Sequence, residues 1–550
     1  MNNSIKKIGL IGLVVIVSAG LFSFKSNYFE ISKNLDIFAS LYKELNTYYV
    51  DDVEPADLMR KGIDAMLKSL DPYTNYISEA EIEGYKMQTT GKYGGIGAAI
   101  RTVGDYVVIT EPYKDFPADK AGLKAGDKIK EIEGKTAKGK NSDEISKILR
   151  GQPGSEVNFK VERPGEPKDI PIKLMREQVK IKSVPYSGII ADDIAYVKLN
   201  SFTRACSKEV AIALTQLKKD NELKGVVFDL RGNRGGLLEE ARNVSNIFIE
   251  KDMEIVSTKG KIEEWAKTLN AKRDAVDSEI PLVVLTDKSS ASASEIVSGV
   301  VQDYDRGLIV GQRTFGKGLV QTTKNLGYNS KLKLTTAKYY TPSGRCIQAI
   351  NYSEKDKDGI VKKMPDSLRT EFKTQNGRIV YDGGGVKPDV EIDIKKYANI
   401  TRSLTSKNHI FNFVTEYVLK NDSIAEPEDF ELTDNDFEDF VQYLDDKEYD
   451  YKTKSELLLQ DLKDATEKEN YYEAVKTDLT ELVDKITNDK NNDIVKHKKE
   501  ILDLIELEII SRYYYSEGRI RCSLTRDEEV LKAIELLKDN KQYEDILSGV

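Results

Sequence analysis

The spacing of apolar residues near the start of the chain is helical. In residues 28–90, apolar side chains recur every three or four positions at Ile31, Leu35, Phe38, Tyr42 and Leu45. Residues 56–70 form a second amphipathic stretch, and Asp-Pro-Tyr at 71–73 interrupts it as a turn. We therefore expect a small helical region over 28–90.

From residue 91 the pattern changes to short strands separated by glycine turns. Residues 127–133 alternate as Asp-Lys-Ile-Lys-Glu-Ile-Glu, which is typical of a half-buried strand. Further strands are predicted at 106–110 and 157–161, and helices at 116–123 and 142–149. Together these elements predict a β/α domain over 91–177.

A third region, 178–395, alternates apolar strands with helices. The predicted strands are 194–199, 225–230, 282–286 and 308–311. Helices are predicted between them at 237–249 and 292–303, and this alternation favours a layered α/β core. From 396 to 550 the chain is charged and helical in pattern, with turns at 426–427 and 491–492. The fold class is therefore multidomain α/β with a helical C-terminal extension.

Residues 1–27 have the pattern of a targeting segment. Lys6 and Lys7 precede an apolar run over 8–24, and Val-Ser-Ala at 17–19 offers small residues for cleavage. The run is at the short end of what spans a bilayer, so a signal peptide and a membrane anchor both remain open. Either implies an exported protein, and a buried core helix is the less favoured alternative.

Composition narrows the function classes. A chain of 550 residues is long enough for several domains, and 39% hydrophobic residues suit a globular protein. The net charge of -9 and the mixing of acidic with basic residues argue against a nucleic-acid partner. The three cysteines are far apart and predict neither a disulfide framework nor a metal site.

Histidine is nearly absent. The chain has only His409 and His497, and both lie in the helical extension. A Ser-His-Asp triad in the α/β core would require this tail to fold back over it, and zinc-ligand spacings are absent. Hydrolysis by the core therefore needs another base. A lysine can serve when its amine is neutral, a state that burial favours.

The candidate nucleophile is Ser292. It follows the strand at 282–286 and begins a helix, where free backbone N–H groups and the helix dipole can stabilise an oxyanion. Ser292 and Glu295 also have the spacing of a capping box, so a purely structural role is the alternative.

The candidate base is Lys317, within Gly-Gln-Arg-Thr-Phe-Gly-Lys-Gly-Leu-Val-Gln at 311–321. Its neighbours Gly316 and Gly318 let backbone approach closely. Gln321 lies on the same face if the segment is extended, and there it can orient the lysine by hydrogen bonding. The alternative is a solvent-facing lysine in a glycine loop.

A third fragment reads Asp-Leu-Arg-Gly-Asn-Arg-Gly-Gly at 229–236. It leaves a predicted strand and enters a helix through a glycine turn, which can present N–H groups to an anion. No Gly-Lys-Ser/Thr follows, which excludes a Walker phosphate loop. We interpret Gly235 or Gly236 as an oxyanion donor.

The segment 91–177 resembles a PDZ domain through its Ala-Gly-Leu-Lys-Ala-Gly-Asp-Lys-Ile turn at 121–129. The resemblance implies that a substrate tail adds as a strand between 96–101 and the helix at 142–149. Its terminal carboxylate would meet the N–H groups of Gly94, Gly95, Ile96 and Gly97. Its last side chain would enter an apolar socket formed by Ile96, Ile145 and Leu149.

The three fragments, with Tyr-Tyr-Thr-Pro-Ser-Gly-Arg at 339–345 and Gly-Val-Lys-Pro-Asp at 385–389, resemble the C-terminal processing peptidases. These are also called tail-specific proteases, of the Ser–Lys class. The resemblance covers residues 30–395 and implies a crotonase-like α/β core. The sequence at 508–515 looks like the extension of Bacteroidetes-type members.

The resemblance also implies residue roles. Ser292 corresponds to the nucleophile and Lys317, 25 residues later, to the general base, whereas the neighbouring Ser290 and Ser294 do not correspond. Gln321 corresponds to the orienting residue. The oxyanion hole corresponds to the N–H groups of Ala293 and of Gly235 or Gly236. No metal or organic cofactor is implied.

The implied activity is serine endopeptidase cleavage near protein C-termini through an acyl-enzyme, with the PDZ domain binding the substrate tail and gating activity. The implied partners are protein tails, the membrane through 1–27, and a second copy in a homodimer. The implied location is the periplasm or the periplasmic face of an inner membrane. Two alternatives stay open: a catalytically silent tail-binding scaffold, and a crotonase-like enzyme acting on acyl-CoA.

Overall fold

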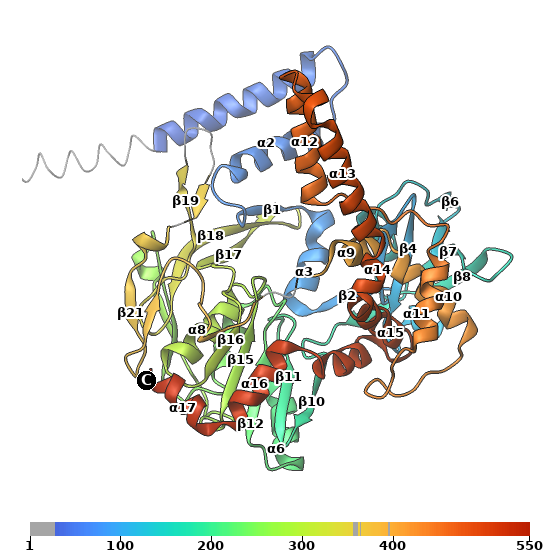
Figure 1. Ribbon diagram of the computed structural model, residues 1–550. Helices are drawn as coiled ribbons and strands as arrows, with labels where there is room; N and C mark the ends of the chain where they lie inside the picture. The colour runs from blue at the N-terminus through green and yellow to red at the C-terminus, as the bar shows by residue number, and fades with distance from the viewer. Residues whose placement is uncertain (1–27, 356–360, 364, 394–395, 550) are drawn as a thin grey trace, which may run out of the picture. The chain divides into compact units, whose positions relative to one another are not determined.

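The computed structural model describes residues 28–355, 361–363, 365–393 and 396–549 (Figure 1). The described chain divides into two compact units, one of 28–79 with 321–335 and one of 80–320 with the rest. The predicted targeting segment 1–27 lies outside the described residues. Within the described ranges, no helix combines the length and apolar character needed to cross a bilayer.

The first unit is mainly helical, as predicted. Residues 28–48 are helical, and α2 (Pro55–Lys68) begins with proline at its first position, where no N–H is needed. The strand β1 (Asn75–Ile77) was not predicted. It pairs antiparallel with β18 (Ser330–Tyr340), with Asn75 opposite Lys333.

The second unit begins with α3 (Ile82–Thr90) and then forms a five-stranded β/α domain. The strand order is β3-β4-β5-β7-β8, with the short β6 (Lys135–Thr136) beside β5. The five strands are β3 (Ala98–Val103), β4 (Tyr106–Pro112), β5 (Lys128–Ile132), β7 (Glu156–Glu162) and β8 (Ile170–Met175). β3 is an edge strand because, in the described ranges, it pairs with no strand except β4, so its outer edge can accept another strand.

The helices of this domain are α4 (Pro117–Lys120) and α5 (Ser142–Leu149). α5 has the predicted bounds because Asn141 caps it, accepting hydrogen bonds from Asp143 N and Glu144 N. The strands β2 (Lys92–Gly95) and β9 (Glu177–Lys180) pair antiparallel where the chain enters and leaves the domain.

A six-stranded sheet forms the α/β core, in the order β10-β11-β12-β15-β16-β23. The strands are β10 (Tyr186–Ala191), β11 (Ile194–Lys198), β12 (Gly225–Asp229), β15 (Leu282–Thr286), β16 (Leu308–Gly311) and β23 (Val390–Glu391). Only β10 runs antiparallel to its neighbour. Every residue of β12, β15 and β16 is buried, which explains why these strands read as continuous apolar runs.

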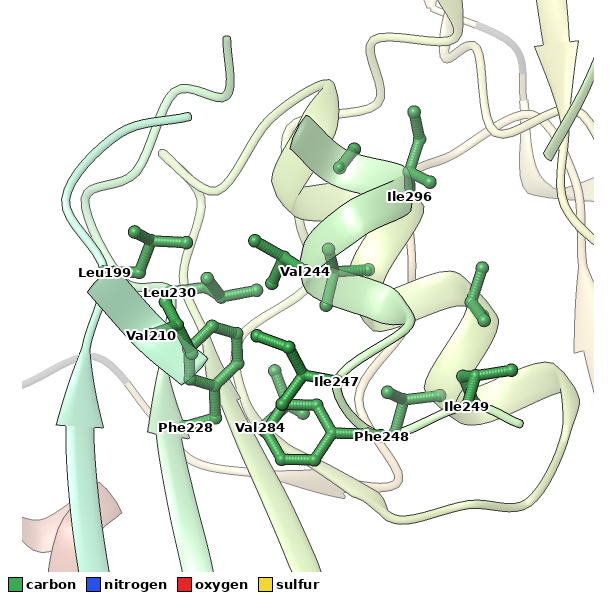
Figure 2. Close-up of a cluster of buried hydrophobic side chains, with 14 of the residues drawn as sticks. Leu199, Val210, Phe228, Leu230, Val244, Ile247, Phe248, Ile249, Val284 and Ile296 are labelled. Carbon is green, nitrogen blue, oxygen red and sulfur yellow. The ribbon is translucent and has the colours of Figure 1, made fainter. Parts of the chain in front are cut away.

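One face of the sheet is covered by α6 (Cys206–Asp220), α7 (Leu238–Ser245) and α8 (Ala293–Asp303). Figure 2 shows the apolar cluster there, to which Phe228 and Val284 from the strands and Val244 and Ile296 from the helices belong. The helices α7 and α8 were both predicted, and α6 was not.

The opposite face is covered by the end of the chain. α16 (Glu528–Lys538) and α17 (Asn540–Ser548) lie against it (Figure 1). Val530 and Leu537 of α16 belong to the same buried cluster as Val227 and Val283 of the sheet. Successive strand residues point to opposite faces, so an all-apolar strand needs a helical layer on each side. The core is therefore completed by residues far beyond the expected boundary at 395.

Several strands outside the core sheet were not predicted. β13 (Glu254–Gly260) pairs with β14 (Lys267–Asn270) and with β18, and β17 (Leu319–Gly327) also pairs with β18. Two small hairpin pairs follow: β19 (Ile350–Lys355) with β20 (Val361–Lys363), and β21 (Glu371–Lys373) with β22 (Ile379–Tyr381).

The C-terminal extension is helical, as predicted, and its breaks near 426 and 491 also occur. Its helices are α9 (Asn399–Ser406), α10 (His409–Lys420), α11 (Asp434–Tyr443), α12 (Lys454–Lys468), α13 (Tyr472–Asn491), α14 (Asp493–Lys496) and α15 (Lys498–Leu524). α15 is interrupted at Tyr515, with φ of 58°, and the Tyr515 hydroxyl donates to Asp119 Oδ1 in the β/α domain at 2.8 Å.

Candidate active site

Two loops meet at the carboxyl edge of the core sheet. One follows β12 and the other follows β15, and these strands are parallel neighbours. Asp287 Oδ1 accepts the Gly232 N–H at 3.0 Å, and the Asn233 carbonyl accepts Ala291 N–H at 3.1 Å and the Ser294 hydroxyl at 2.8 Å. In α/β sheets this edge is where ligands bind.

The three serines of the second loop differ in environment. Ser290 and Ser294 are fully buried, and their hydroxyls donate to the carbonyls of Leu230 and Asn233. Ser292 is half-buried and has φ of 56° and ψ of -110°, a strained conformation for a residue with a side chain. A strained turn between strand and helix is how several hydrolases expose a nucleophilic serine. Of these three, Ser292 is the residue suited to attack.

A buried carboxylate joins Ser292 to the lysine loop. Glu295 Oε2 accepts Ser292 N–H and Lys317 N–H, each at 2.8 Å, so the two nitrogens lie no more than twice that distance apart. Glu295 Oε1 accepts the Thr314 hydroxyl and Gly316 N–H, each at 2.6 Å. The structure thus brings together the two main-chain positions that the sequence paired.

Burial raises the pKa of Glu295, and the hydrogen bonds from the Thr314 hydroxyl and the three backbone N–H groups oppose the rise. The bond from Ser292 N–H is the one that a capping box requires. The other donors come from 314–317, so Glu295 also fixes the lysine loop. A role as a helix cap alone does not account for the hydrogen bonds that Glu295 accepts from 314–317.

The glycines beside Lys317 allow close packing. A Cβ on Gly316, with φ of +90°, would lie 2.5 Å from the Cβ of Ala349, and one on Gly318 would lie 2.9 Å from Gln348 N. Gln348 Oε1 in turn accepts Gly318 N–H at 2.7 Å. Lys317 itself is half-buried.

Gln321 lies in β17, so the segment is extended there. Its Nε2 donates to Thr335 Oγ1 at 3.2 Å, and both residues belong to the first unit. Its role in orienting Lys317 stays a prediction.

Of the two glycines predicted as oxyanion donors, Gly235 lies beside Ser292. A Cβ on Gly235 would be 2.8 Å from Ala293 N and 2.9 Å from Ser292 Cβ, so this backbone is in direct contact with the serine turn. Gly235 N–H donates to Asn233 Oδ1 at 2.9 Å. In the described part of the chain, no acceptor takes the N–H of Gly236 or Ala293. Gly236 is therefore the better donor of the two glycines.

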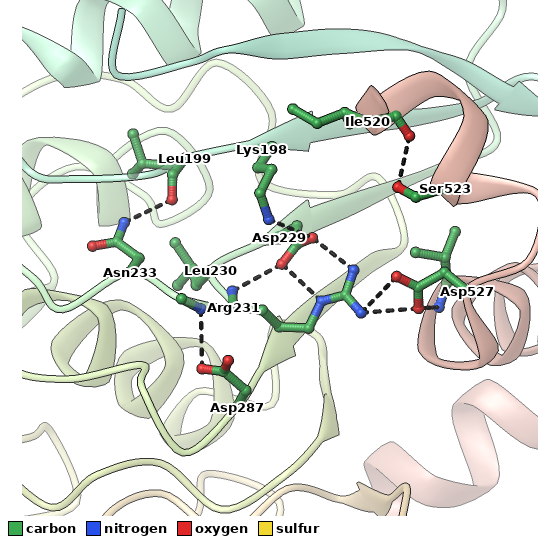
Figure 3. A network of polar contacts seen from close by, with 12 residues as sticks. Lys198, Leu199, Asp229, Leu230, Arg231, Asn233, Asp287, Ile520, Ser523 and Asp527 are labelled. Carbon is green, nitrogen blue, oxygen red and sulfur yellow. Dashed lines mark hydrogen bonds and ion pairs between the residues drawn. The ribbon is translucent and has the colours of Figure 1, made fainter. Parts of the chain in front are cut away.

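The start of the third motif forms an ion-pair network (Figure 3). Asp229 is fully buried and accepts from the Tyr196 hydroxyl at 2.6 Å, from Lys198 Nζ at 3.1 Å and from Arg231. Burial alone would raise the pKa of Asp229, but the charges of Arg231 and Lys198 outweigh it and hold the pKa well below its usual range. Arg231 also pairs with Asp527 and Glu529. The sequence did not predict Asp527 and Glu529 as partners of Arg231, because no local pattern at 527–529 indicates contact with the core sheet.

The two remaining motifs, at 339–345 and 385–389, form hydrogen bonds with the serine turn and the lysine loop. The Tyr339 hydroxyl donates to the Ser292 carbonyl at 3.2 Å, and Val386 N–H donates to Thr314 Oγ1 at 2.7 Å. Arg345, 1% exposed, pairs with Asp303 at the far end of α8 at 2.7 Å.

The three residues predicted to line the tail socket lie in the β/α domain. Ile96, Ile145 and Leu149 belong to one buried cluster. Gly97 has φ of +74°, and a Cβ there would lie 2.4 Å from Phe116 Cβ, so this turn requires glycine.

Sequence reasoning missed Arg150, which directly follows α5. Its Cγ lies 3.7 Å from where a Gly95 Cβ would be, and its guanidinium lies 5.2 Å from the Tyr93 ring centroid. Among residues that the structure describes, none forms a hydrogen bond or ion pair with the Arg150 side chain. Burial raises the pKa of Tyr93, and the charge of Arg150 opposes this rise. The positively charged Arg150 side chain therefore lies beside the glycine turn at 94–97.

Neither histidine supplies a triad base. His409 Nε2 lies 3.0 Å from the Glu448 carbonyl, and His497 directly precedes α15, so both histidines belong to the helical C-terminal region. The three cysteines are free. No group of three potential metal ligands occurs among the described residues.

Comparison with known proteins places the chain in a family. Family models match at 94–174 (PDZ domain), 193–356 (Peptidase family S41) and 400–537 (Probable PDZ-protease, C-terminal helical domain). The carboxy-terminal-processing protease of Bartonella bacilliformis is 38% identical over 321 residues, which cover 58% of this chain and 73% of that protein. The chain belongs to peptidase family S41. It is a serine peptidase with a PDZ domain, an S41 core and a C-terminal helical domain.

Two further proteins are similar to this chain. A probable CtpA-like serine protease of Staphylococcus aureus is 36% identical over 370 residues, covering 67% of this chain and 66% of that protein. The solved photosystem II D1 C-terminal processing protease is 28% identical, with 65% of this chain and 92% of that chain covered and a TM-score of 0.35.

Proposed function

We propose that this S41 peptidase is an endopeptidase that cleaves proteins near their C-termini, with Ser292 as nucleophile and Lys317 as general base. The observation that carries the proposal is the sharing of Glu295 Oε2 by the main-chain nitrogens of Ser292 and Lys317. This shared acceptor joins the serine turn to the lysine loop through main-chain atoms, so the contact does not depend on the rotamers of the Ser292 and Lys317 side chains.

The proposed chemistry is acyl transfer in two steps. The neutral Lys317 amine takes the Ser292 hydroxyl proton, the serine oxygen attacks the peptide carbonyl, and the lysinium returns the proton to the leaving amine. Water then repeats the cycle on the acyl-enzyme. The N–H groups of Ala293 and Gly236 stabilise the oxyanion, a contribution of about 3 kcal/mol for each donor.

We also propose that the PDZ domain binds the substrate tail. The tail adds along the open edge of β3, and its last side chain enters the socket of Ile96, Ile145 and Leu149. Its carboxylate meets the glycine turn and the unpaired Arg150 guanidinium beside it.

Tail binding is further proposed to gate cleavage. The test compares cleavage of an internal-site peptide with and without a second, uncleavable peptide that carries a free carboxylate. Stimulation supports gating. An unchanged rate, together with full activity after replacement of the Leu149 and Arg150 side chains by alanine, contradicts it.

Export and self-association are separate proposals. Action in the periplasm or at the inner membrane follows from the sequence of 1–27, and cell fractionation with protease accessibility tests it. A homodimer is consistent with the exposed apolar side chains on the helix at 28–48, which are Phe29, Ile31, Leu35, Phe38 and Leu41. Light scattering of the full chain tests this, and a monomer at all concentrations contradicts it.

The central experiment incubates the full chain with an unfolded protein that ends in apolar residues. Wild type, Ser292→Ala and Lys317→Ala are compared, with Lys251→Ala as an exposed lysine control. Mass spectrometry is expected to show fragments starting near the C-terminus for wild type and the control only. The scaffold alternative predicts tail binding with no wild-type cleavage, and the acyl-CoA alternative predicts thioester turnover instead.

A further inference from the structure

The Arg231 side chain connects the core sheet to the C-terminal helical domain (Figure 3). On one side its Nε and Nη2 donate to the two carboxylate oxygens of Asp229, at 3.0 and 2.8 Å. On the other side its Nη1 pairs with Asp527 at 2.8 Å and with Glu529. The Arg231 and Glu529 side chains are each 14% exposed, so solvent screens these charges little.

Arg231 also begins the loop that ends at Gly236. Arg231 N–H donates to Asp229 Oδ1 at 2.8 Å, so the loop leaves the sheet from a fixed point. Glycines with positive φ follow at 232, 235 and 236. Because glycine has little conformational preference of its own, contacts rather than local propensity must hold this loop.

The acidic partners are themselves fixed. Asp527 caps α16, accepting Glu529 N–H at 3.1 Å and Val530 N–H at 3.2 Å. α16 is anchored to the sheet by the buried Val530 and Leu537. The N-cap residue Asp527 and Glu529 in the first turn of α16 therefore hold their carboxylates next to Arg231 on a helix that is anchored to the sheet.

We propose that Asp527 and Glu529 are positioning residues for catalysis. They hold Arg231 against Asp229 and thereby set the loop that places the Gly236 N–H beside Ser292. This assigns an active-site role to the C-terminal helical domain and rests on the proposed oxyanion hole. Oxyanion donors act on the transition state, so the loss is expected in kcat with little change in KM.

The test compares full-length wild type with the double variant Asp527→Asn/Glu529→Gln. These substitutions keep side-chain size and remove the charges that hold Arg231. Glu535→Gln is the matched control, because Glu535 lies on the exposed side of the same helix and, among the described residues, forms an ion pair with Lys532 alone. The expected result is a kcat at least tenfold lower and a KM within twofold in a folded protein, with a lower melting temperature because a largely buried ion pair is lost, and with the control at wild-type values.

A second readout separates positioning from general damage. A peptide aldehyde adds the Ser292 oxygen to its carbonyl carbon, and the resulting tetrahedral oxygen uses the oxyanion donors. Its affinity is expected to fall by the same factor as kcat/KM in the double variant, whereas affinity for an uncleavable tail peptide stays unchanged. The single variant Glu529→Gln is expected to show the same pattern to a smaller extent, and it replaces the double variant if that does not fold.

Two results overturn the proposal. One is a folded variant whose kcat and aldehyde affinity stay within twofold of wild type. The other is a loss of tail-peptide affinity by the same factor as aldehyde affinity, which is structural damage alone. If wild type cleaves while Ser292→Ala does not, either result rejects only this inference. If wild type cleaves nothing, the proposed function fails first and this inference with it.

Discussion

Ser292 and Lys317 donate their main-chain N–H groups to one and the same oxygen, Oε2 of the buried Glu295. A carboxylate inside an apolar helix is costly unless its hydrogen bonds are satisfied, and here four donors satisfy it. The Glu295 side chain thus helps to set the position of the serine turn relative to the lysine loop, together with the main-chain hydrogen bond from Phe315 N–H to the Ser290 carbonyl at 3.0 Å.

Glu295→Gln is expected to damage both activity and stability. The amide NH₂ of glutamine would face backbone N–H groups that now donate to oxygen, leaving buried donors unpaired at a cost of about 1–3 kcal/mol each. Steady-state kinetics are expected to show at least a hundredfold lower kcat, and urea unfolding a lower midpoint. Glu239→Gln, on the exposed side of α7, serves as the control. Full activity of Glu295→Gln would show that this carboxylate does not hold the site.

Gly235→Ala is expected to abolish cleavage, because the added methyl would lie 2.5 Å from the Ala291 carbonyl oxygen and 2.9 Å from Ser292 Cβ. Gly232→Ala in the same loop is the matched control, since it also has positive φ but nothing within 4 Å of the added Cβ. The control is expected to lose about 1 kcal/mol of stability and to keep its activity. Equal kinetics for the two variants would contradict the close contact with Ser292.

Arg150→Gln is expected to weaken recognition of a free C-terminus. Fluorescence anisotropy with one peptide, ending in either a carboxylate or an amide, measures the preference for the carboxylate. Wild type is expected to prefer it by at least tenfold, and the variant is expected to lose most of this margin, because a charge-assisted hydrogen bond is worth about 1.5–3 kcal/mol. Lys147→Gln, exposed on α5, is expected to behave as wild type. An unchanged margin in Arg150→Gln would remove Arg150 from the tail site.

Asp229 is expected to stabilise the fold in a pH-dependent way. Its pKa is held below the usual range in the folded chain, so its ionised form stabilises the fold above the unfolded pKa. The gap in unfolding free energy between wild type and Asp229→Asn is expected to be constant from pH 8 to 5 and to shrink only below about pH 4. Urea unfolding across this range measures it, and a gap that grows toward acid would contradict the ion-pair network.

The sequence predicted well those elements whose signals are local. α5 has its expected bounds because Asn141 and Glu144 cap it next to a clear apolar face. β15 and β16 were also predicted with the observed bounds, because a strand buried on both faces is an apolar run between turns. β13 and β18 were missed because they carry many polar residues and are specified by pairing across the chain.

The sequence could predict where a helix follows a strand through a turn, as at Ser292, and the chemical role of that serine stays a prediction. The roles of Glu295, Asp527 and Glu529 could not be predicted, because each depends on contacts made after folding. Glu295 did leave one signal: it is a single acidic residue between Ser-Ala-Ser-Ala-Ser and Ile-Val-Ser-Gly-Val-Val. An acid in so apolar a helix has to be satisfied by residues from elsewhere in the chain.

The most direct test labels the full chain with a fluorophosphonate, which reacts with activated serines, and sequences the tryptic peptide 289–306 by mass spectrometry. The adduct is expected on Ser292 in wild type and is expected to be absent from Lys317→Ala. An adduct on Ser290 or Ser294, or one on Ser292 that persists undiminished without Lys317, would contradict the assignment of this pair.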